Sequence, residues 1–218
     1  MKNESMLEMF PGIRAAIFDV DGTLLDSMPI WEDAGEKYLH TLGITARPGL
    51  GKVLFPMSME EAAVYMREEY RLPCTAAEIV AGVAQTIDAF YREEVLLKDG
   101  AEVLLSSLAS RGVKLAVATS GNRALCEAAL TRLGVRNYFS GIFTCSEVGA
   151  GKSRPDIFLR AVQFLGSEPA ETWVFEDALH AIETAKKAGF PVAAIYDKSN
   201  ESQMDRIKEI SDVYLETY

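Results

Sequence analysis

Cysteine and histidine are scarce in this sequence, with three and two among 218 residues. Cys74, Cys126 and Cys145 form no Cys-x-x-Cys pair, and their odd number argues against both a disulfide framework and a zinc site. His40 and His180 are isolated as well, so soft metal ligands are not gathered anywhere in the chain. We expect three reduced thiols and no transition-metal centre.

Long apolar runs and an excess of basic residues are also missing. No stretch approaches the ~18 consecutive apolar residues of a membrane span, and residues 1–12 contain no apolar run of signal length. The chain has 22 Lys and Arg against 32 Asp and Glu, a net charge of −10, which disfavours a nucleic-acid partner. We expect a cytoplasmic, monomeric protein without a membrane partner. A small anionic substrate stays possible, because a metal ion and one lysine can reverse the charge locally.

Apolar runs of strand length alternate with helical segments of ~11 residues, each closed by a glycine. This rhythm predicts an α/β fold, a Rossmann-like, mostly parallel sheet with helices on both faces. The expected strands are 13–20, 113–118, 142–145, 172–175, 191–196 and 213–215. The expected helices between them are 101–111, 123–133, 155–165 and 178–188.

One long region breaks the alternation, because residues 29–97 contain helical patterns and no convincing strand. Capping-box sequences begin there at Ser58 and at Thr75, each with a glutamate three residues later. We expect a small helical domain over 28–97, inserted into an α/β core domain of 1–27 and 98–218.

The expected strands are followed by polar side chains that can carry chemistry. Ligands of open α/β sheets bind outside the carboxyl ends of the strands. The residues at these positions are Asp19 and Asp21, Thr119 and Ser120, Lys152, and the pair Glu176 and Asp177. Four clustered acids repel one another, and hard oxygens without a nearby His or Cys suit Mg²⁺. With Mg²⁺ and a lysine in place, an aspartate can attack a phosphate and form an aspartyl-phosphate.

This pattern resembles the haloacid dehalogenase-like superfamily of phosphotransferases, and in its details the β-phosphoglucomutase-like phosphatases. The matching segments are Asp-Val-Asp-Gly-Thr-Leu at 19–24, Thr119, Gly-Lys-x-x-Pro-Asp-x-Phe at 151–158 and Phe-Glu-Asp at 175–177. They cover nearly the whole chain in the family's order, and the insertion resembles the family's helical cap.

The resemblance implies a role for each matching residue. Asp19 is the implied nucleophile, and Asp21 the general acid and then the general base. Thr119 hydrogen-bonds the transferring phosphoryl group, and Lys152 holds phosphate and nucleophile together. The implied phosphate-binding set is Asp21, Thr119, Ser120 and Lys152.

The implied Mg²⁺ ligands are the Asp19 side chain, the Asp21 backbone carbonyl and Asp177, with Glu176 assisting directly or through water.

Each motif taken alone also has a purely structural explanation. Asp-x-Asp-Gly occurs in solvated turns with a left-handed glycine, and acids such as Glu176 and Asp177 also favour a helix N-terminus. Only the joint pattern is specific.

The function expected first is a Mg²⁺-dependent phosphohydrolase of a small phosphorylated metabolite. The alternatives are a phosphosugar mutase of the β-phosphoglucomutase type and a catalytically idle regulator that binds a phosphometabolite. In the mutases a histidine twelve residues beyond the first aspartate is implicated in gating, whereas Trp31 stands at that position here. Trp31, Arg47 and Lys52 are the candidate substrate contacts in the insertion.

Overall fold

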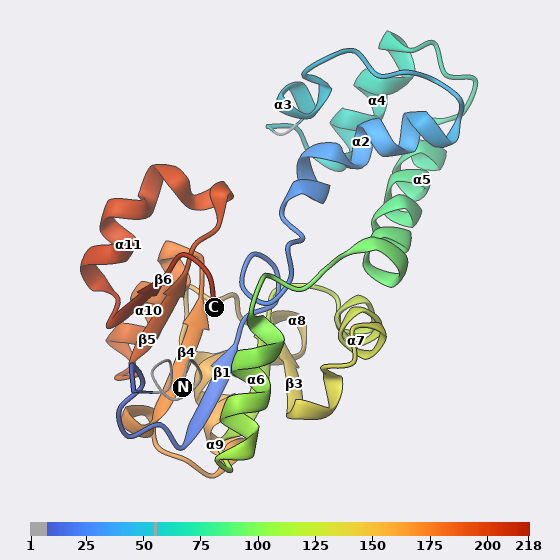
Figure 1. Ribbon diagram of the computed structural model, residues 1–218. Coiled ribbons are helices and arrows are strands. Elements are labelled where there is room, and N and C mark those ends of the chain that lie inside the picture. The colour runs from blue at the N-terminus through green and yellow to red at the C-terminus, as the bar shows by residue number, and fades with distance from the viewer. Residues whose placement is uncertain (1–7, 55) are drawn as a thin grey trace. The chain divides into compact units, whose positions relative to one another are not determined.

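The structure is a computed structural model that describes residues 8–54 and 56–218, and it divides into two compact units (Figure 1). The core unit comprises the described residues of Met1–Asp26 together with Leu96–Tyr218. The cap unit is Ser27–Val95. The cap unit is therefore an insertion that the chain enters soon after the first strand and leaves before the second.

A six-stranded sheet of order β3-β2-β1-β4-β5-β6 forms the centre of the core unit, and every neighbouring pair is parallel. Its strands are β1 (Ala15–Phe18), β2 (Lys114–Thr119), β3 (Phe139–Thr144), β4 (Thr172–Glu176), β5 (Val192–Ile195) and β6 (Val213–Leu215). The strand order reverses beside β1, which lies between β2 and β4. Such a switch point opens a crevice at the carboxyl ends of the strands, where ligands of this architecture bind.

Helices cover both faces of this sheet, and every residue of its central strands β1 and β4 is therefore buried. Their bounds are α6 (Ala101–Ser110), α7 (Arg123–Arg132), α8 (Cys145–Val148), α9 (Asp156–Leu165), α10 (Leu179–Lys187) and α11 (Met204–Ile210). Ala15 and Ile17 of β1 belong to the core cluster with α9 and α10. Phe18 stacks on Phe175 of β4 with ring centroids 4.2 Å apart.

The predicted fold class is confirmed, and the predicted ends of the helices in the core unit are close to those observed. The third strand is a partial error. It was expected over 142–145 but begins at Phe139 and ends at Thr144. Cys145 starts α8 because the Thr144 side chain accepts a hydrogen bond from the Glu147 backbone N–H, which caps a new helix.

The regular elements in the described part of the cap unit are all helices: α2 (Pro29–Thr41), α3 (Leu50–Leu54), α4 (Met59–Glu69), α5 (Ala76–Ala89) and a π-helical turn (Phe90–Glu94). Both expected capping boxes are confirmed, at Ser58 with α4 and at Thr75 with α5. Gly82 on α5 gives room to the ring of Tyr38 on α2, since a Cβ at Gly82 would lie 2.1 Å from that ring. Nowhere in the described chain is a helix long and apolar enough to cross a membrane.

Candidate active site

Three carboxylates and one lysine meet at the carboxyl ends of β1 and β4. Asp19 directly follows β1, Glu176 ends β4 and Asp177 comes next, so the parallel pairing of the two strands brings these acids together. Lys152, from the loop before α9, donates hydrogen bonds to Asp19 Oδ1 and, at 2.8 Å, to Glu176 Oε2. All four side chains are buried. The site is thus a preformed buried cluster of charges.

The electrostatics of this cluster are unbalanced, with three acids around one ammonium group. Burial, with a further contribution from Glu176, raises the pKa of Asp19 to about 6, although Lys152 opposes the shift. Burial and the charges of Glu176 and Asp19 raise the pKa of Asp177 well above its usual value. Burial alone lowers the pKa of Lys152, but Asp19 and Glu176 outweigh it and raise that pKa above its usual value. A further positive charge would therefore stabilise the ionised cluster.

The donor set fits a hard divalent cation. Asp19, Glu176 and Asp177 each offer a carboxylate oxygen, and these oxygens lie within 4.8 Å of one another. No histidine or cysteine belongs to this group, so its chemistry matches Mg²⁺ better than a transition metal.

Asp21 and Thr119 line the next part of the same strand edge. Thr119 is the last residue of β2, and its buried Oγ1 accepts a hydrogen bond of 2.9 Å from the Gly121 backbone N–H. A Cβ placed on Gly121 would lie 3.0 Å from Asp21 Oδ2 and 3.2 Å from Thr119 Oγ1. Both oxygens therefore lie close to Gly121, which places Asp21 and Thr119 near each other.

The loop after β1 has the backbone that a turn requires, since Gly22 has a φ of 84° and its N–H donates to the Leu25 carbonyl at 3.0 Å. A tight turn there is thus present together with the acid cluster. The explanation of Asp-x-Asp-Gly as a turn therefore accounts for the local backbone, but it does not account for the acid cluster.

Ser120 and Cys126 also lie at this edge of the sheet. Ser120 Oγ is 3.4 Å from Cys145 Sγ, and its predicted contact with phosphate stays a prediction. Burial, with the charges of Asp21 and Asp19, raises the pKa of Cys126 to about 12. Its thiol is protonated at neutral pH and is therefore a poor nucleophile.

The sequence does not identify two hydrogen-bond partners of Asp177, or a third residue that binds one of these partners. Thr23 Oγ1 donates to Asp177 Oδ1 at 3.0 Å, and Asn200 Nδ2 donates to Asp177 Oδ2 at 2.7 Å. The Tyr218 hydroxyl donates to the Thr23 backbone carbonyl at 3.0 Å. Thr23 lies within the motif at 19–24, and Asn200 follows β5 at the edge formed by the carboxyl ends of the strands. Both residues could therefore have been proposed from the sequence. Nothing in the sequence indicates a role for Tyr218.

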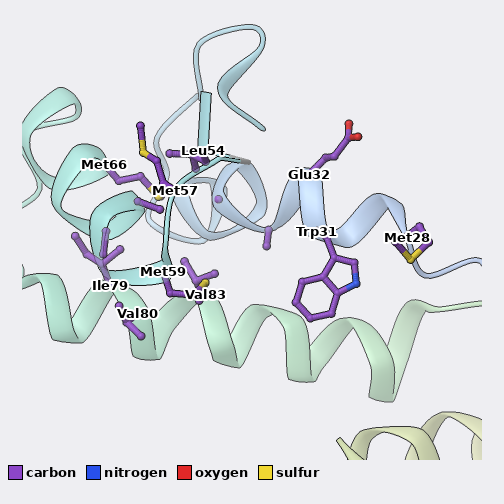
Figure 2. Close-up of a pocket in the computed structure, with 14 residues that line it drawn as sticks. Met28, Trp31, Glu32, Leu54, Met57, Met59, Met66, Ile79, Val80 and Val83 are labelled. Carbon is purple, nitrogen blue, oxygen red and sulfur yellow. The ribbon is translucent and has the colours of Figure 1, made fainter. Parts of the chain in front are cut away.

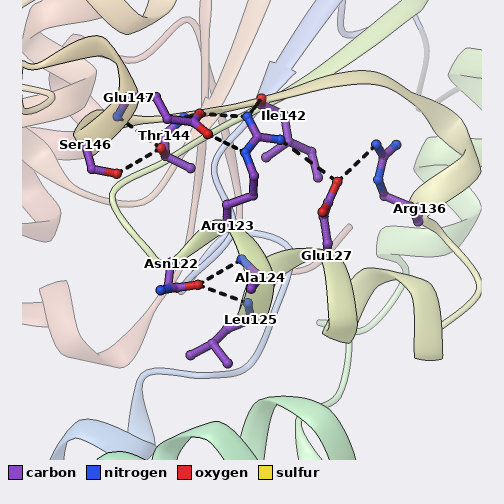
Figure 3. A network of polar contacts seen from close by, with 10 residues as sticks. All are labelled: Asn122, Arg123, Ala124, Leu125, Glu127, Arg136, Ile142, Thr144, Ser146 and Glu147. Atoms are coloured by element: carbon purple, nitrogen blue, oxygen red, sulfur yellow. Dashed lines mark hydrogen bonds and ion pairs between the residues drawn. The ribbon is translucent and has the colours of Figure 1, made fainter.

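A polar network joins the segment after β2, which carries Ser120, to α8, which precedes the loop of Lys152 (Figure 3). Asn122 caps α7, just after Ser120, by accepting from the Ala124 N–H at 2.8 Å. Arg123 then reaches Glu147 on α8, with Nη2 2.7 Å from Oε2. The hydrogen bond from Arg123 holds the pKa of Glu147 at about 2, so this ion pair persists over the neutral pH range. The network thereby fixes the segment after β2 relative to α8.

Of the candidate substrate residues of the cap unit, one lines a pocket and two do not. Trp31 is 50% exposed and lines an apolar pocket of about 500 Å³ whose other walls include Met57, Met66 and Val83 (Figure 2). Arg47 and Lys52 do not line this pocket. Arg47 forms an ion pair with Glu69, and its N–H donates to the Tyr70 hydroxyl at 2.9 Å. The roles expected for Trp31, Arg47 and Lys52 stay predictions.

The sheet, the switch point and the acid–lysine cluster together define an α/β domain with a buried anionic cluster at the ligand-binding edge of its sheet. The sequence profile of the haloacid dehalogenase-like hydrolases matches residues 13–189, and the chain belongs to this family. The family and the enzyme class predicted from the sequence, a phosphatase, are confirmed.

Two relatives that are named as phosphatases support the assignment of this chain to the phosphatases. The chain is 29% identical over 208 residues to the bifunctional riboflavin kinase/FMN phosphatase of Arabidopsis thaliana, covering 93% of this chain and 55% of that protein. It therefore spans about half the length of this relative. It is 27% identical over 177 residues to the phosphorylated carbohydrates phosphatase of Thermotoga maritima, covering 81% and 82% of the two chains.

Solved structures show the same architecture. A provisionally named β-phosphoglucomutase from Thermotoga maritima superposes with a TM-score of 0.81 at 25% identity, covering 94% of each chain.

Proposed function

We propose that this protein hydrolyses a small phosphorylated metabolite through a Mg²⁺-dependent reaction with an aspartyl-phosphate intermediate. The observation that carries the proposal is the buried cluster in which Lys152 donates to both Asp19 and Glu176 while Asp177 lies beside them. Phosphatase activity on small phosphorylated compounds is also what the named relatives share in their names.

The proposed cation site uses the Asp19 and Asp177 side chains and the Asp21 backbone carbonyl, with Glu176 assisting directly or through water. Bound there, Mg²⁺ supplies the positive charge that lets a phosphate dianion approach a carboxylate. Lys152 supports the same approach from the protein side, because its ammonium group keeps Asp19 ionised and contributes charge to phosphate binding.

In the first proposed step, a carboxylate oxygen of Asp19 attacks phosphorus, and the bond from phosphorus to the leaving oxygen breaks. Asp21 donates a proton to that oxygen, so the product leaves as an alcohol. In the second step the Asp21 carboxylate accepts a proton from water as the water oxygen attacks phosphorus, which releases phosphate and restores Asp19. Thr119 Oγ1 hydrogen-bonds the phosphoryl oxygens, with Ser120 as the neighbouring candidate.

Metal removal is the direct test of this proposal. With p-nitrophenyl phosphate as a generic substrate, activity is expected in Mg²⁺ and is expected to disappear in excess EDTA, because the acids then lose their counter-charge. Adding back Mg²⁺ should restore it. Full turnover by EDTA-treated protein would show that the metal assignment is wrong.

A phosphosugar mutase is the second candidate, favoured by the similarity to the provisionally named β-phosphoglucomutase. A mutase must protect its aspartyl-phosphate from water until the sugar arrives. The gating histidine implied for those enzymes is replaced by Trp31, whose indole cannot titrate near neutral pH. Water should therefore compete freely for the intermediate.

The two functions can be separated with β-glucose 1-phosphate, Mg²⁺ and a trace of glucose 1,6-bisphosphate. We expect any turnover to release free phosphate. Rapid, near-stoichiometric conversion to glucose 6-phosphate with little phosphate release would identify a mutase. An idle regulator would bind phosphorylated compounds without turning over either these or the aryl phosphate.

A further inference from the structure

A chain of hydrogen bonds leads from Asp177 away from the active site toward Lys98. Both carboxylate oxygens of Asp177 are engaged, Oδ1 by Thr23 Oγ1 at 3.0 Å and Oδ2 by Asn200 Nδ2 at 2.7 Å. Asp177 is 3% exposed, so these donors fix the direction of a side chain that is shielded from water. Asn200 therefore helps to set where the Asp177 oxygens point.

Asn200 is itself held by the 3₁₀ turn Lys198–Gln203 that follows β5. Its backbone N–H donates to the Asp197 carbonyl at 3.1 Å. The Asp197 side chain closes the same turn, since Oδ1 accepts from the Ser199 N–H at 2.9 Å and from Ser199 Oγ at 2.6 Å. The carboxylate of Asp197 thus determines the backbone path that presents Asn200 to Asp177.

The other oxygen of Asp197 is bound by Lys98. Lys98 Nζ donates to Asp197 Oδ2 at 2.8 Å and to the Tyr196 carbonyl at 2.6 Å, and the two charged side chains are 15% and 6% exposed. The Lys98 N–H donates to the Leu24 carbonyl at 2.9 Å, in the loop after β1. This largely buried ion pair therefore ties the turn after β5 to the loop that begins with Asp19.

We infer that Asn200 is a positioning residue for Asp177, held in place by the Asp197–Lys98 pair, and that it sets the affinity of the acid cluster for Mg²⁺. The inference rests on the proposed function for the identity of the cation. An amide side chain suits this position because it orients Asp177 by hydrogen bonding and brings no positive charge that would compete with a cation for the same carboxylate. Partners behind a metal ligand typically change metal affinity 10–100-fold when they are removed.

The test compares Asn200→Ala with Asn137→Ala, an exposed asparagine in the same unit. Mg²⁺ binding to EDTA-treated, dialysed protein is measured by isothermal titration calorimetry and by the rise in Tm with added Mg²⁺, neither of which needs turnover. For Asn200→Ala we expect Mg²⁺ binding to weaken by about 10-fold or more, and the Mg²⁺ concentration for half-maximal activity to rise in parallel. The kcat at saturating Mg²⁺ should change less. Asn137→Ala should match the wild type.

Lys98→Met tests the support behind Asn200, and Lys98→Arg is its conservative partner. We expect Lys98→Met to weaken Mg²⁺ binding, as Asn200→Ala does. Lys98→Arg should keep most of the wild-type affinity for Mg²⁺. Near-UV circular dichroism confirms that each variant is folded before titration.

Two results would overturn the inference while leaving the phosphatase proposal intact: wild-type Mg²⁺ affinity in folded Asn200→Ala, or a loss of kcat without any change in Mg²⁺ binding. Wild-type protein that hydrolyses phosphate esters without binding Mg²⁺ would instead refute the metal part of the proposed function, and this inference with it.

Discussion

Replacing Asp19 with Asn is expected to remove phosphatase activity, by a factor on the order of 10⁴ or more, as is usual when a covalent nucleophile is lost. An amide keeps the size of the side chain and a hydrogen-bond acceptor for Lys152, but it cannot form the bond to phosphorus. The measurement is the initial rate with p-nitrophenyl phosphate at saturating Mg²⁺. Beryllium fluoride, which mimics a phosphoryl group, should bind at Asp19 in the wild type and not in the variant.

The same substitution should make the metal-free protein more stable. Burial and Glu176 raise the pKa of Asp19 from 3.8 to about 6. A carboxyl group whose folded-state pKa is raised stabilises the fold below pH ~4, and that contribution is lost as the pH rises toward 6. At neutral pH the ionised side chain therefore costs up to about 3 kcal/mol, which an uncharged Asn avoids. Urea unfolding in EDTA at pH 7.5 measures this gain.

These two measurements distinguish loss of the nucleophile from loss of the fold. An inactive Asp19→Asn protein that is at least as stable as the wild type supports the covalent mechanism. Near-native activity would exclude Asp19 as the nucleophile, and reduced stability in EDTA would contradict the electrostatic description of the cluster.

Periodicity and strand-end reasoning were enough to predict the parallel sheet and to bring Asp19, Lys152, Glu176 and Asp177 into one candidate set. The reason is physical: in a parallel sheet every strand delivers its carboxyl end to the same edge, so neighbouring ends meet. The error in the predicted end of β3 has a cause that is visible in the sequence. Thr144-x-x-Glu147 is the same capping pattern that was recognised at Ser58, and it ends the strand where the helix begins.

The contacts behind the site could not be predicted in the same way. Thr23 and Asp177 are 154 positions apart, and their hydrogen bond depends on the packing of two loops. Several polar residues follow β5, and periodicity does not say which of them faces Asp177. Arg47 is a candidate substrate contact in the sequence, but in the structure it pairs with Glu69, which lies 22 positions away. Such pairings are properties of the tertiary structure.

Replacing Lys152 with Met is expected to damage both stability and catalysis. The side chain is buried and donates to Asp19 and Glu176, so its removal leaves three neighbouring carboxylates without their ammonium partner. Removing one partner of a buried ion pair typically costs ~3–5 kcal/mol. Lost charge complementarity toward phosphate should also lower kcat/KM, by a factor on the order of 10²–10³.

The loss of stability should depend on pH in a defined direction. Lys152 lowers the pKa of Asp19 and of Asp177, so both values rise further in Lys152→Met. Groups with raised folded-state pKa values stabilise the protein while protonated, and this contribution disappears as the pH rises through those values. The stability of the variant should therefore be close to that of the wild type near pH 4, and the loss of stability should be largest above pH ~6. Urea unfolding in EDTA at pH 4.5 and 7.5 measures the difference, with Lys187→Met, an exposed lysine on α10, as the control. A loss of equal size at both pH values would mean that Lys152 acts by packing and not by its charge.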